Sequence, residues 1–215
     1  MSDAIGTLER ITVWGPYFRV STGPADDRWR PTAELRTPAT RDALVADMAA
    51  RIGTAEPRVA VSTLFFGYVA RLWSMAIGSV VDSGRCVRLD PELLLWRNAG
   101  GLHLHITEPD FGDGVAVEVL DRQIGPLVDS WSNKAAAGLL WGNTASALIG
   151  AGRVIGSATG PHVDSLLSDP RLADAIDPAT GRRRSCCLYY RTPTGGVCGD
   201  CVFPTPPKDL SKEIP

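Results

Sequence analysis

The chain has 215 residues, of which 44 % are hydrophobic, and a formal net charge of −2 at pH 7. The length suits one large domain, or one domain with an appendage, and the balanced charge argues against nucleic acid as a partner. The first residues, MSDAIGTLER, lack the basic start and the apolar core of a secretory signal, so we expect a cytoplasmic protein.

The first quarter of the chain predicts one extended segment and one helix. Residues 10–20, RITVWGPYFRV, indicate a strand or a hairpin that turns at a Gly-Pro pair. A helix is predicted over 38–52, because Thr37 is a good N-cap, proline follows at the first helical position, and Gly53 supplies a stop.

An apolar stretch covers residues 59–81, VAVSTLFFGYVARLWSMAIGSVV, and is about long enough to span a bilayer. Arg71 lies close to its middle, where a charge costs roughly 2.5–3.5 kcal/mol on insertion scales. Serine and threonine residues dilute the stretch further. We therefore expect a buried central helix and not a membrane span.

Residues 85–107 change character, with short apolar or alternating runs that predict two or three strands of a small antiparallel sheet. His103 and His105 alternate on one of these strands and so share a face, where they could contact a substrate or accept released iron. A partly exposed strand face is the alternative interpretation. Cys86 is interpreted as a small core residue.

Two further helices are predicted over 119–131 and 135–158, followed by a short one over 162–176. The 135–158 helix is rich in Ala, Gly and Ser, although each Gly costs up to about 1 kcal/mol of helix propensity relative to Ala. Close packing against another helix explains so many small residues. Trp141 and Asn143 could line a cleft, and an aromatic side chain buried between helices is the alternative.

Together the elements predict a mostly helical α+β fold with a small antiparallel sheet and a C-terminal cysteine module. The predicted division is a helical domain over 1–180 and a cysteine-containing segment over 181–215. The tail that follows residue 203 is expected to be extended and mobile.

Four of the five cysteines fall within SCCLYYRTPTGGVCGDC at residues 185–201, where an adjacent pair, ten residues and a Cys-x-x-Cys follow one another. Thioredoxin-type exchange needs a helix at its Cys-x-x-Cys, and the prolines of the following VFPTPP prevent one. A c-type haem needs His directly after the motif, where this chain has Val. Clustered cysteines in a cytosolic protein therefore point to a metal site or to redox chemistry.

Structural zinc and a [2Fe–2S] cluster can each take four thiolates. A Cys-x-x-Cys knuckle is normal for zinc, whereas two adjacent cysteines are not. Adjacent side chains of an extended chain point to opposite sides, which suits two metal atoms better than one. The residues favour [2Fe–2S] and leave open zinc, inert or disulfide-forming thiols, and the question of which cysteine binds which iron.

Three arginines, Arg182, Arg183 and Arg184, directly precede the adjacent cysteines, and Arg191 follows them. A [2Fe–2S] centre with four thiolates becomes more negative when it is reduced. Nearby guanidinium groups and backbone N–H donors therefore favour the added electron and raise the potential. The alternative for this arginine run is a solvated charged face, or a docking patch for an acidic partner.

At these residues the sequence resembles the ferric-siderophore reductases of the FhuF-like family. The resemblance is carried by R-R-S-C-C-L-Y-Y-R and G-x-C-G-D-C within residues 183–201, and the upstream LLWGNTASALIGAGRVI at 139–155 is similar to the family's helical segment before the cluster. The resemblance implies a [2Fe–2S] cofactor held by four ligands, Cys186, Cys187, Cys198 and Cys201. It also implies a siderophore-binding role for the domain at 1–180.

The implied activity is one-electron reduction of Fe(III) in an imported siderophore, most often a hydroxamate, with release of Fe(II) in the cytoplasm. Such a protein is cytosolic or peripheral at the inner face of the membrane. Because the chain shows no nucleotide-binding fingerprint, we expect an external donor of the ferredoxin or flavodoxin class. A non-enzymatic iron–sulfur carrier or redox sensor, and a zinc-stapled binding domain, are the alternatives. The substrate-binding candidates are His103, His105, Trp141, Asn143 and Arg184.

Overall fold

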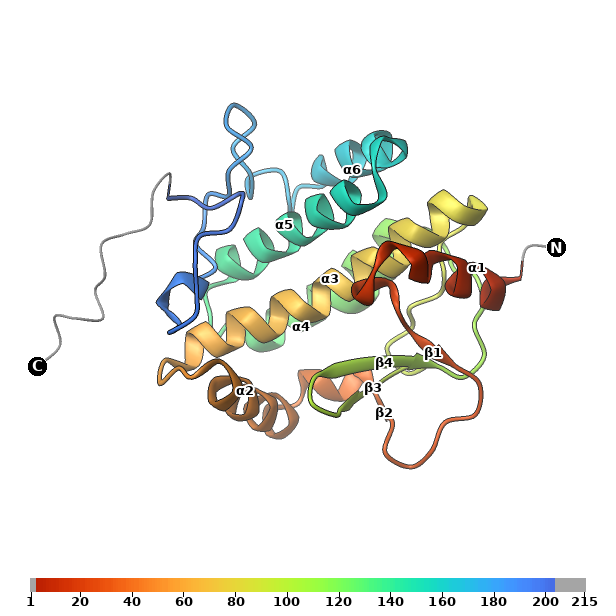
Figure 1. Cartoon of the computed structure of the whole chain (residues 1–215), viewed down its shortest axis with the longest axis horizontal. Helices are drawn as coiled ribbons and strands as arrows, with labels where there is room; N and C mark the ends of the chain where they lie inside the picture. The colour runs from red at the N-terminus through yellow and green to blue at the C-terminus, as the bar shows by residue number, and fades with distance from the viewer. Residues whose placement is uncertain (1–2, 204–215) are drawn as a thin grey trace, which may run out of the picture.

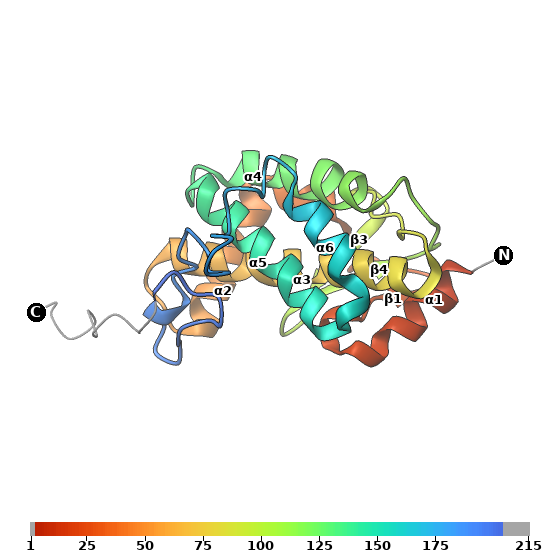
Figure 2. The ribbon, with the colours of Figure 1, turned by 90° about the horizontal axis from the view of Figure 1, so that it is seen from above.

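The computed structural model describes residues 3–203, and the predicted mobile tail lies outside this range (Figure 1). Two long helices, α3 (Pro57–Ser83) and α5 (Ala137–Ile155), lie side by side through the middle of the molecule. The other helices and a small sheet pack around them, which confirms the predicted α+β class. Residues 181–203 lie at the end of the molecule opposite α1 (Ala4–Ile11) in both views (Figures 1 and 2).

Helix α3 is the central core helix that the sequence predicts. Among the described residues it is long and apolar enough to cross a membrane, but 72 % of its apolar window is buried inside the chain. Arg71, at its middle, donates to the carbonyl of Gly67 and lies over the ring of Tyr17, 4.9 Å from its centroid. The arginine therefore reaches the surface along its own helix while the rest of the helix supplies the core.

Helix α2 (Pro38–Ile52) has the predicted bounds. The hydroxyl of Thr37 accepts from the backbone N–H of Thr40, and Gly53 ends the helix in the left-handed conformation with φ 65°. Both signals are local, so sequence alone placed them.

The extended segment predicted over 10–20 is wrong. The chain forms α1 and then two short 3₁₀ turns, Thr12–Trp14 and Pro16–Phe18. Asp3 caps α1 by accepting from the N–H of Ile5, and the turns then fold onto α3. A Cβ built at Gly78 of α3 would lie 3.3 Å from the side chain of Phe18, so the second turn packs tightly against this glycine. This contact across the fold overrides the local β propensity.

The sheet has four short strands in the order β1-β4-β3-β2. The predicted hairpin forms from β3 (Leu94–Asn98) and β4 (Leu102–Ile106), which pair antiparallel with Leu94 opposite Ile106. β2 (Arg30–Pro31) adds antiparallel to β3, whereas β1 (Ser21–Thr22) adds parallel to β4. The sheet is thus mixed and not wholly antiparallel, because the two outer strands come from the distant N-terminal region.

The helix predicted over 119–131 is two elements, a π-helix, η4 (Ala116–Ile124), and then α4 (Gly125–Trp131). The short helix predicted over 162–176 is α6 (Gly160–Leu167), which ends three residues before Pro170. The predicted helix is therefore too long, because residues just before a proline avoid the helical conformation.

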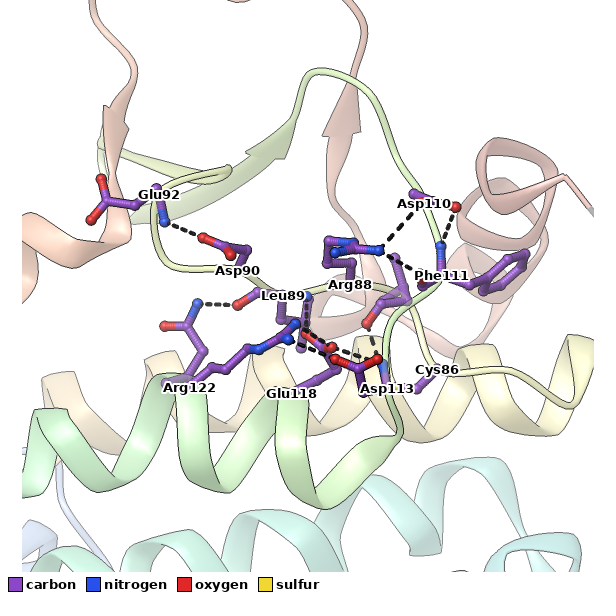
Figure 3. Close-up of polar contacts among 12 residues, drawn as sticks. Cys86, Arg88, Leu89, Asp90, Glu92, Asp110, Phe111, Asp113, Glu118 and Arg122 are labelled. Atoms are coloured by element: carbon purple, nitrogen blue, oxygen red, sulfur yellow. Dashed lines mark hydrogen bonds and ion pairs between the residues drawn. The ribbon is translucent and has the colours of Figure 1, made fainter.

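Glu118 on η4 anchors the loops on the sheet side of the molecule (Figure 3). Its carboxylate is fully buried and accepts from the backbone N–H groups of Leu89 and Asp113 and from Arg122 Nη1, at 2.8, 2.9 and 2.6 Å. A Cβ at Gly112 would lie 2.1 Å from Glu118 Oε1, so only glycine fits there. Cys86, also part of this region, is buried in the core as predicted.

The small residues of α5 permit two close approaches. A Cβ at Gly152 would lie 2.9 Å from the side chain of Val163 on α6, and one at Gly142 would lie 2.0 Å from the hydroxyl of Ser185. The first is the close helix contact that the composition predicts. The contact between Gly142 and Ser185 places the cysteine segment directly against α5.

Candidate metal centre

The cysteine segment, residues 181–203, contains turns and one short 3₁₀ element, η6 (Tyr189–Arg191), and is held to the helices by side chains. Ser62 of α3 donates from its hydroxyl to the carbonyl of Cys187 at 2.7 Å. Asn143 of α5 donates to the hydroxyl and the carbonyl of Ser62 at 2.9 and 3.1 Å. Both central helices therefore position the backbone next to the adjacent cysteines.

All four cysteines of the segment are free thiols, with Cys201 buried and the others half-buried. Cys187 Sγ and Cys198 Sγ lie 3.4 Å apart, although ten residues separate them in the chain. Two thiolates at tetrahedral positions on one metal ion, each at about 2.3 Å, are ~3.8 Å apart. This pair already has nearly the spacing that two thiolates need on one metal ion.

The chain bends sharply just after the adjacent cysteines. Leu188 has φ 65° and ψ 0°, the only described residue other than glycine with a positive φ, and its N–H lies 3.3 Å from Cys186 Sγ. A side chain in this conformation costs on the order of 1 kcal/mol, and such residues cluster at functional sites. The bend leaves Cys187, but not Cys186, on the wall of the cavity described below.

Arg183 is the arginine of the predicted run that reaches a cysteine sulfur. Its guanidinium is 2 % exposed, donates to Cys198 Sγ, and donates to Asn143 Oδ1 at 3.0 Å. Its Nε lies 3.2 Å from Asp200 Oδ2, an ion pair whose two atoms are not aligned for a hydrogen bond. Arg182 instead donates to the carbonyl of Cys201, and Arg184 is exposed.

The sulfurs of Cys187 and Cys198 titrate as a pair. The hydrogen bond from Cys198, together with the nearby charge of Arg183, holds the pKa of Cys187 well below its usual range. The same hydrogen bond and burial raise the pKa of Cys198 above its usual range. Metal ligation needs deprotonated thiols, so this direction for Cys187 is compatible with a ligand role.

A cavity of about 460 Å³ opens beside this pair, between α3, α5 and the cysteine segment. Two of the four sulfur-bearing residues, Cys187 and Cys198, contribute to its wall. Its size lies within the range of about 300–1,000 Å³ that is usual for small-molecule sites. The wall also includes Tyr17, Ser62, Phe66, Ser146, Arg153 and Arg183.

Residues 183–203 match the family model for the FhuF 2Fe-2S C-terminal domain. This segment is similar to that domain and carries a C-terminal 2Fe-2S motif. Its cofactor is thus a [2Fe–2S] cluster, as the cysteine spacing predicts, and its role is similar to that of iron–sulfur proteins that reduce siderophore iron. No curated protein matches the chain.

The residues present in the FhuF-type segment fit such a cluster. Among residues 3–203, the structure gathers no group of three or more His, Cys, Asp or Glu side chains around one point. A [2Fe–2S] group needs two pairs of thiolates and not one common centre. In addition, the buried guanidinium of Arg183 donates to Cys198 Sγ, so a positive charge lies beside the sulfurs, where it can stabilise a group with four negative thiolates.

The two predicted histidines lie on β4, outside the wall of the cavity next to the FhuF-type segment. His105 is buried and stacks on Trp29, and its Nε2 lies 2.8 Å from the carbonyl of Gly23. His103 is exposed, with Nε2 3.1 Å from the carbonyl of Ala99. The two share a face of the strand, but only His103 is exposed there, because Trp29 covers His105, which connects the sheet to its neighbouring loop.

The other predicted substrate residues also lie off the cavity wall. Trp141 is half-buried, with the guanidinium of Arg171 6.0 Å from its ring centroid. Asn143 is buried, donates to Ser62 and accepts from Arg183, so it links the two residues that contact the cysteine segment. Arg184 is exposed and does not contribute to the wall.

Sequence analysis missed several residues at the site. Ser62 and Thr63 stood out as polar residues in an apolar helix, and that signal was interpreted only as dilution of a membrane span. Asp200 lies inside the Cys-x-x-Cys and could have been chosen as a buried partner for an arginine. Tyr17 and Arg153 carry no local signal, because only the fold brings them to the cavity.

Proposed function

We propose that this chain reduces Fe(III) in ferric siderophores by one electron and releases Fe(II) in the cytoplasm. The observation that carries the proposal is the position of the FhuF-type segment, whose Cys187 and Cys198 form part of the wall of a ligand-sized cavity. A redox group held there can transfer an electron to a bound chelate without a long path through protein.

The chemistry that a [2Fe–2S] group supplies when bound is the transfer of one electron, so that Fe(III) in the chelate becomes Fe(II) as the cluster returns to its oxidised form. Hard hydroxamate or catecholate oxygens hold Fe(III) far more tightly than Fe(II), because the charge density of the metal falls on reduction. The weakened chelate then loses its iron to softer ligands.

Each residue near the sulfurs has a role in this proposal. Cys186, Cys187, Cys198 and Cys201 are the four ligands. Arg183, buried against Cys198, places a positive charge where the added electron makes the site more negative. Asn143 and Ser62 hold the arginine and the cysteine segment in place.

The partners follow from the same chemistry. Three singly charged hydroxamate groups neutralise Fe(III), and a neutral complex suits a wall with aromatic side chains and hydroxyls better than a highly charged one does. A ferric hydroxamate is therefore the proposed substrate, and a ferredoxin or flavodoxin-type protein the proposed electron donor. The proposed location is the cytoplasm or the inner face of the membrane, where such donors are found.

The test begins with protein purified without air. Iron and acid-labile sulfide are measured per chain, and the reduced protein is then mixed with ferric hydroxamate and ferric catecholate chelates in a stopped-flow spectrometer. We expect about two irons and two sulfides per chain, followed by bleaching of the chelate in step with cluster oxidation. Full occupancy by zinc, or a cluster that no ferric chelate oxidises, would contradict the proposal, and the second result favours an electron carrier or sensor.

A further inference from the structure

The cavity at the cysteine segment continues into a groove between the two central helices. A second cavity, of about 250 Å³, shares Tyr17, Phe66 and Gly150 with the first and extends toward the 3₁₀ turns after α1. One open surface thus runs from Cys187 and Cys198 along α3 and α5. Its far part has a mainly apolar wall.

A cluster held by the four cysteines would account for only one end of this groove. Of its four proposed ligands, Cys186 and Cys201 are not part of the wall. A group bound to all four sulfurs therefore sits at the cysteine end. The space between Phe66 and Gly150 remains for another ligand.

The wall next to the sulfurs offers both polar and apolar contacts. Ser62, Thr63 and Ser146 supply hydroxyls, and Phe66 supplies an aromatic face. Arg153 is exposed at the rim and adds a guanidinium that can donate to chelate oxygens. The other arginine of the wall, Arg183, is already paired with Asp200.

We propose that the ferric chelate binds in this groove, with its iron centre against Cys187 and Cys198 and its organic part along α3 and α5 as far as Gly150. The inference rests on the proposed function and assigns its substrate site. The ligand class is a compact oxygen chelate of a trivalent metal, of low net charge, with Arg153 as a residue that contacts it.

Gly150 provides a direct test, because a Cβ there would meet no atom within 4 Å. Gly150→Leu places a side chain in the groove without a clash in the free protein. Gly138→Leu is the matched control, since Gly138 lies on the same helix, also has open space at its Cβ, and does not border the groove.

The probe is a gallium(III) chelate, because gallium(III) has the charge and nearly the size of Fe(III) but is not reduced. Binding of gallium tris-hydroxamate and tris-catecholate to the cluster-loaded full chain is measured by calorimetry. We expect Gly150→Leu to weaken binding about tenfold or more, and Gly138→Leu to change it less than about twofold. Equal binding by both variants and the unmodified chain would overturn the groove assignment.

If Gly150→Leu loses its cluster, a second pair of variants tests whether the chelate binds in the groove. Arg153→Gln removes the guanidinium at the rim, and Arg184→Gln removes an exposed one off the wall. We expect roughly fivefold weaker binding for the first and no change for the second. Equal effects of the two would overturn the assignment.

The outcomes separate this inference from the proposed function. If no gallium chelate binds the unmodified chain and no ferric chelate oxidises it, the proposed function fails. If chelates bind and react but the groove variants behave like their controls, only the site is wrong.

A chromium(III) tris-hydroxamate gives an independent check. Bound in the groove, the paramagnetic chelate would speed the spin relaxation of the reduced cluster, which EPR measures. Unchanged relaxation at saturating chelate would contradict the assignment.

Discussion

Glu118 and Arg183 are both fully buried charged residues, yet their surroundings differ in one respect. The Glu118 carboxylate has two backbone N–H donors and Arg122 as partners, and Gly112 closes the remaining space (Figure 3). Around Arg183, the facing atoms of the Arg183–Asp200 ion pair make no aligned hydrogen bond within residues 3–203, and a cavity lies beside them. The region around Glu118 is closed, because neighbouring groups fill it, and the region around Arg183 is open, because it borders a cavity.

The comparison distinguishes a buried charge that stabilises the fold from a buried charge that can act on a bound group. A fully hydrogen-bonded polar network makes a fold rigid and specific, whereas a buried ion pair that borders a cavity and donates to a cysteine sulfur can also act on a group bound there. The region around Glu118 therefore holds loops, and the region around Arg183 is prepared for a charged group. Changes in the first should alter stability alone, and changes in the second should alter the cofactor.

The largest contrast is expected between two cysteines. Cys198→Ala removes a proposed ligand and should reduce cluster content from nearly full to below about a tenth, because three thiolates leave one iron incompletely bound. Cys86→Ala lies in the Glu118 region and should leave the iron and sulfide content unchanged, at a cost of about 1 kcal/mol of stability. Iron and sulfide analysis of both proteins checks this. A full cluster in Cys198→Ala would remove that residue from the ligand set.

Glu118→Ala should destabilise the fold by about 1–3 kcal/mol, because it leaves the buried N–H of Leu89 and the N–H of Asp113 without their acceptor, while Arg122 keeps its ion pair with Asp113. Glu118→Gln keeps the shape and should cost less. Urea unfolding measures both values. Wherever the variants retain a cluster, its potential should equal that of the unmodified chain, and a shifted potential would show that the closed region is coupled to the open one.

Arg183→Gln should lower the cluster potential by about 40–80 mV, which corresponds to the loss of roughly 1–2 kcal/mol of charge-assisted stabilisation of the reduced form. The direction follows because the positive charge lost had favoured the added electron, and Asp200 is left uncompensated. Arg184→Gln, at an exposed position, is the control and should shift the potential little, since salt screens it. Spectroelectrochemical titration measures both, and equal shifts would favour a general charge effect of the whole arginine run.

The smallest effect is expected at Asn143, which connects Ser62 to Arg183. Asn143→Ala should cost about 1–3 kcal/mol of stability and lower the potential by less than Arg183→Gln does, because the guanidinium keeps its charge but loses one anchor. Asn143→Asp restores an acceptor and adds a negative charge, so its potential should lie below that of Asn143→Ala. A potential unchanged in both variants would mean that Asn143 supports the fold alone.

Several predictions from sequence hold because their signals are local. The N-cap at Thr37 and the stop at Gly53 delimit α2 without help from other segments. The length and apolar character of the run at 59–81 require burial, which gives the central helix. The spacing of the four cysteines likewise indicated the cofactor, because donor types and their separation restrict the metal chemistry.

The substrate-binding candidates show that local sequence signals do not predict which residues meet in the fold. His103 and His105 were chosen for their chemistry, but the sheet that holds them packs away from the cysteine segment. Conversely, Tyr17 and Arg153 belong to the cavity wall although 135 positions separate them in the printed sequence. Proximity of this kind depends on how helices pack and is not contained in any short window.

By itself, the sequence restricted the metal group to a thiolate-bound one and favoured [2Fe–2S], because four thiols and their spacing act before any fold exists, and the match of residues 183–203 to a 2Fe-2S domain is likewise a property of the sequence. The tertiary structure alone decided which arginine touches sulfur and which two cysteines meet the cavity, since contacts such as Ser62 with Cys187 join residues 125 positions apart. The physical reason is that ligand chemistry belongs to individual side chains, whereas burial, charge pairing and open space arise only when α3 and α5 pack together.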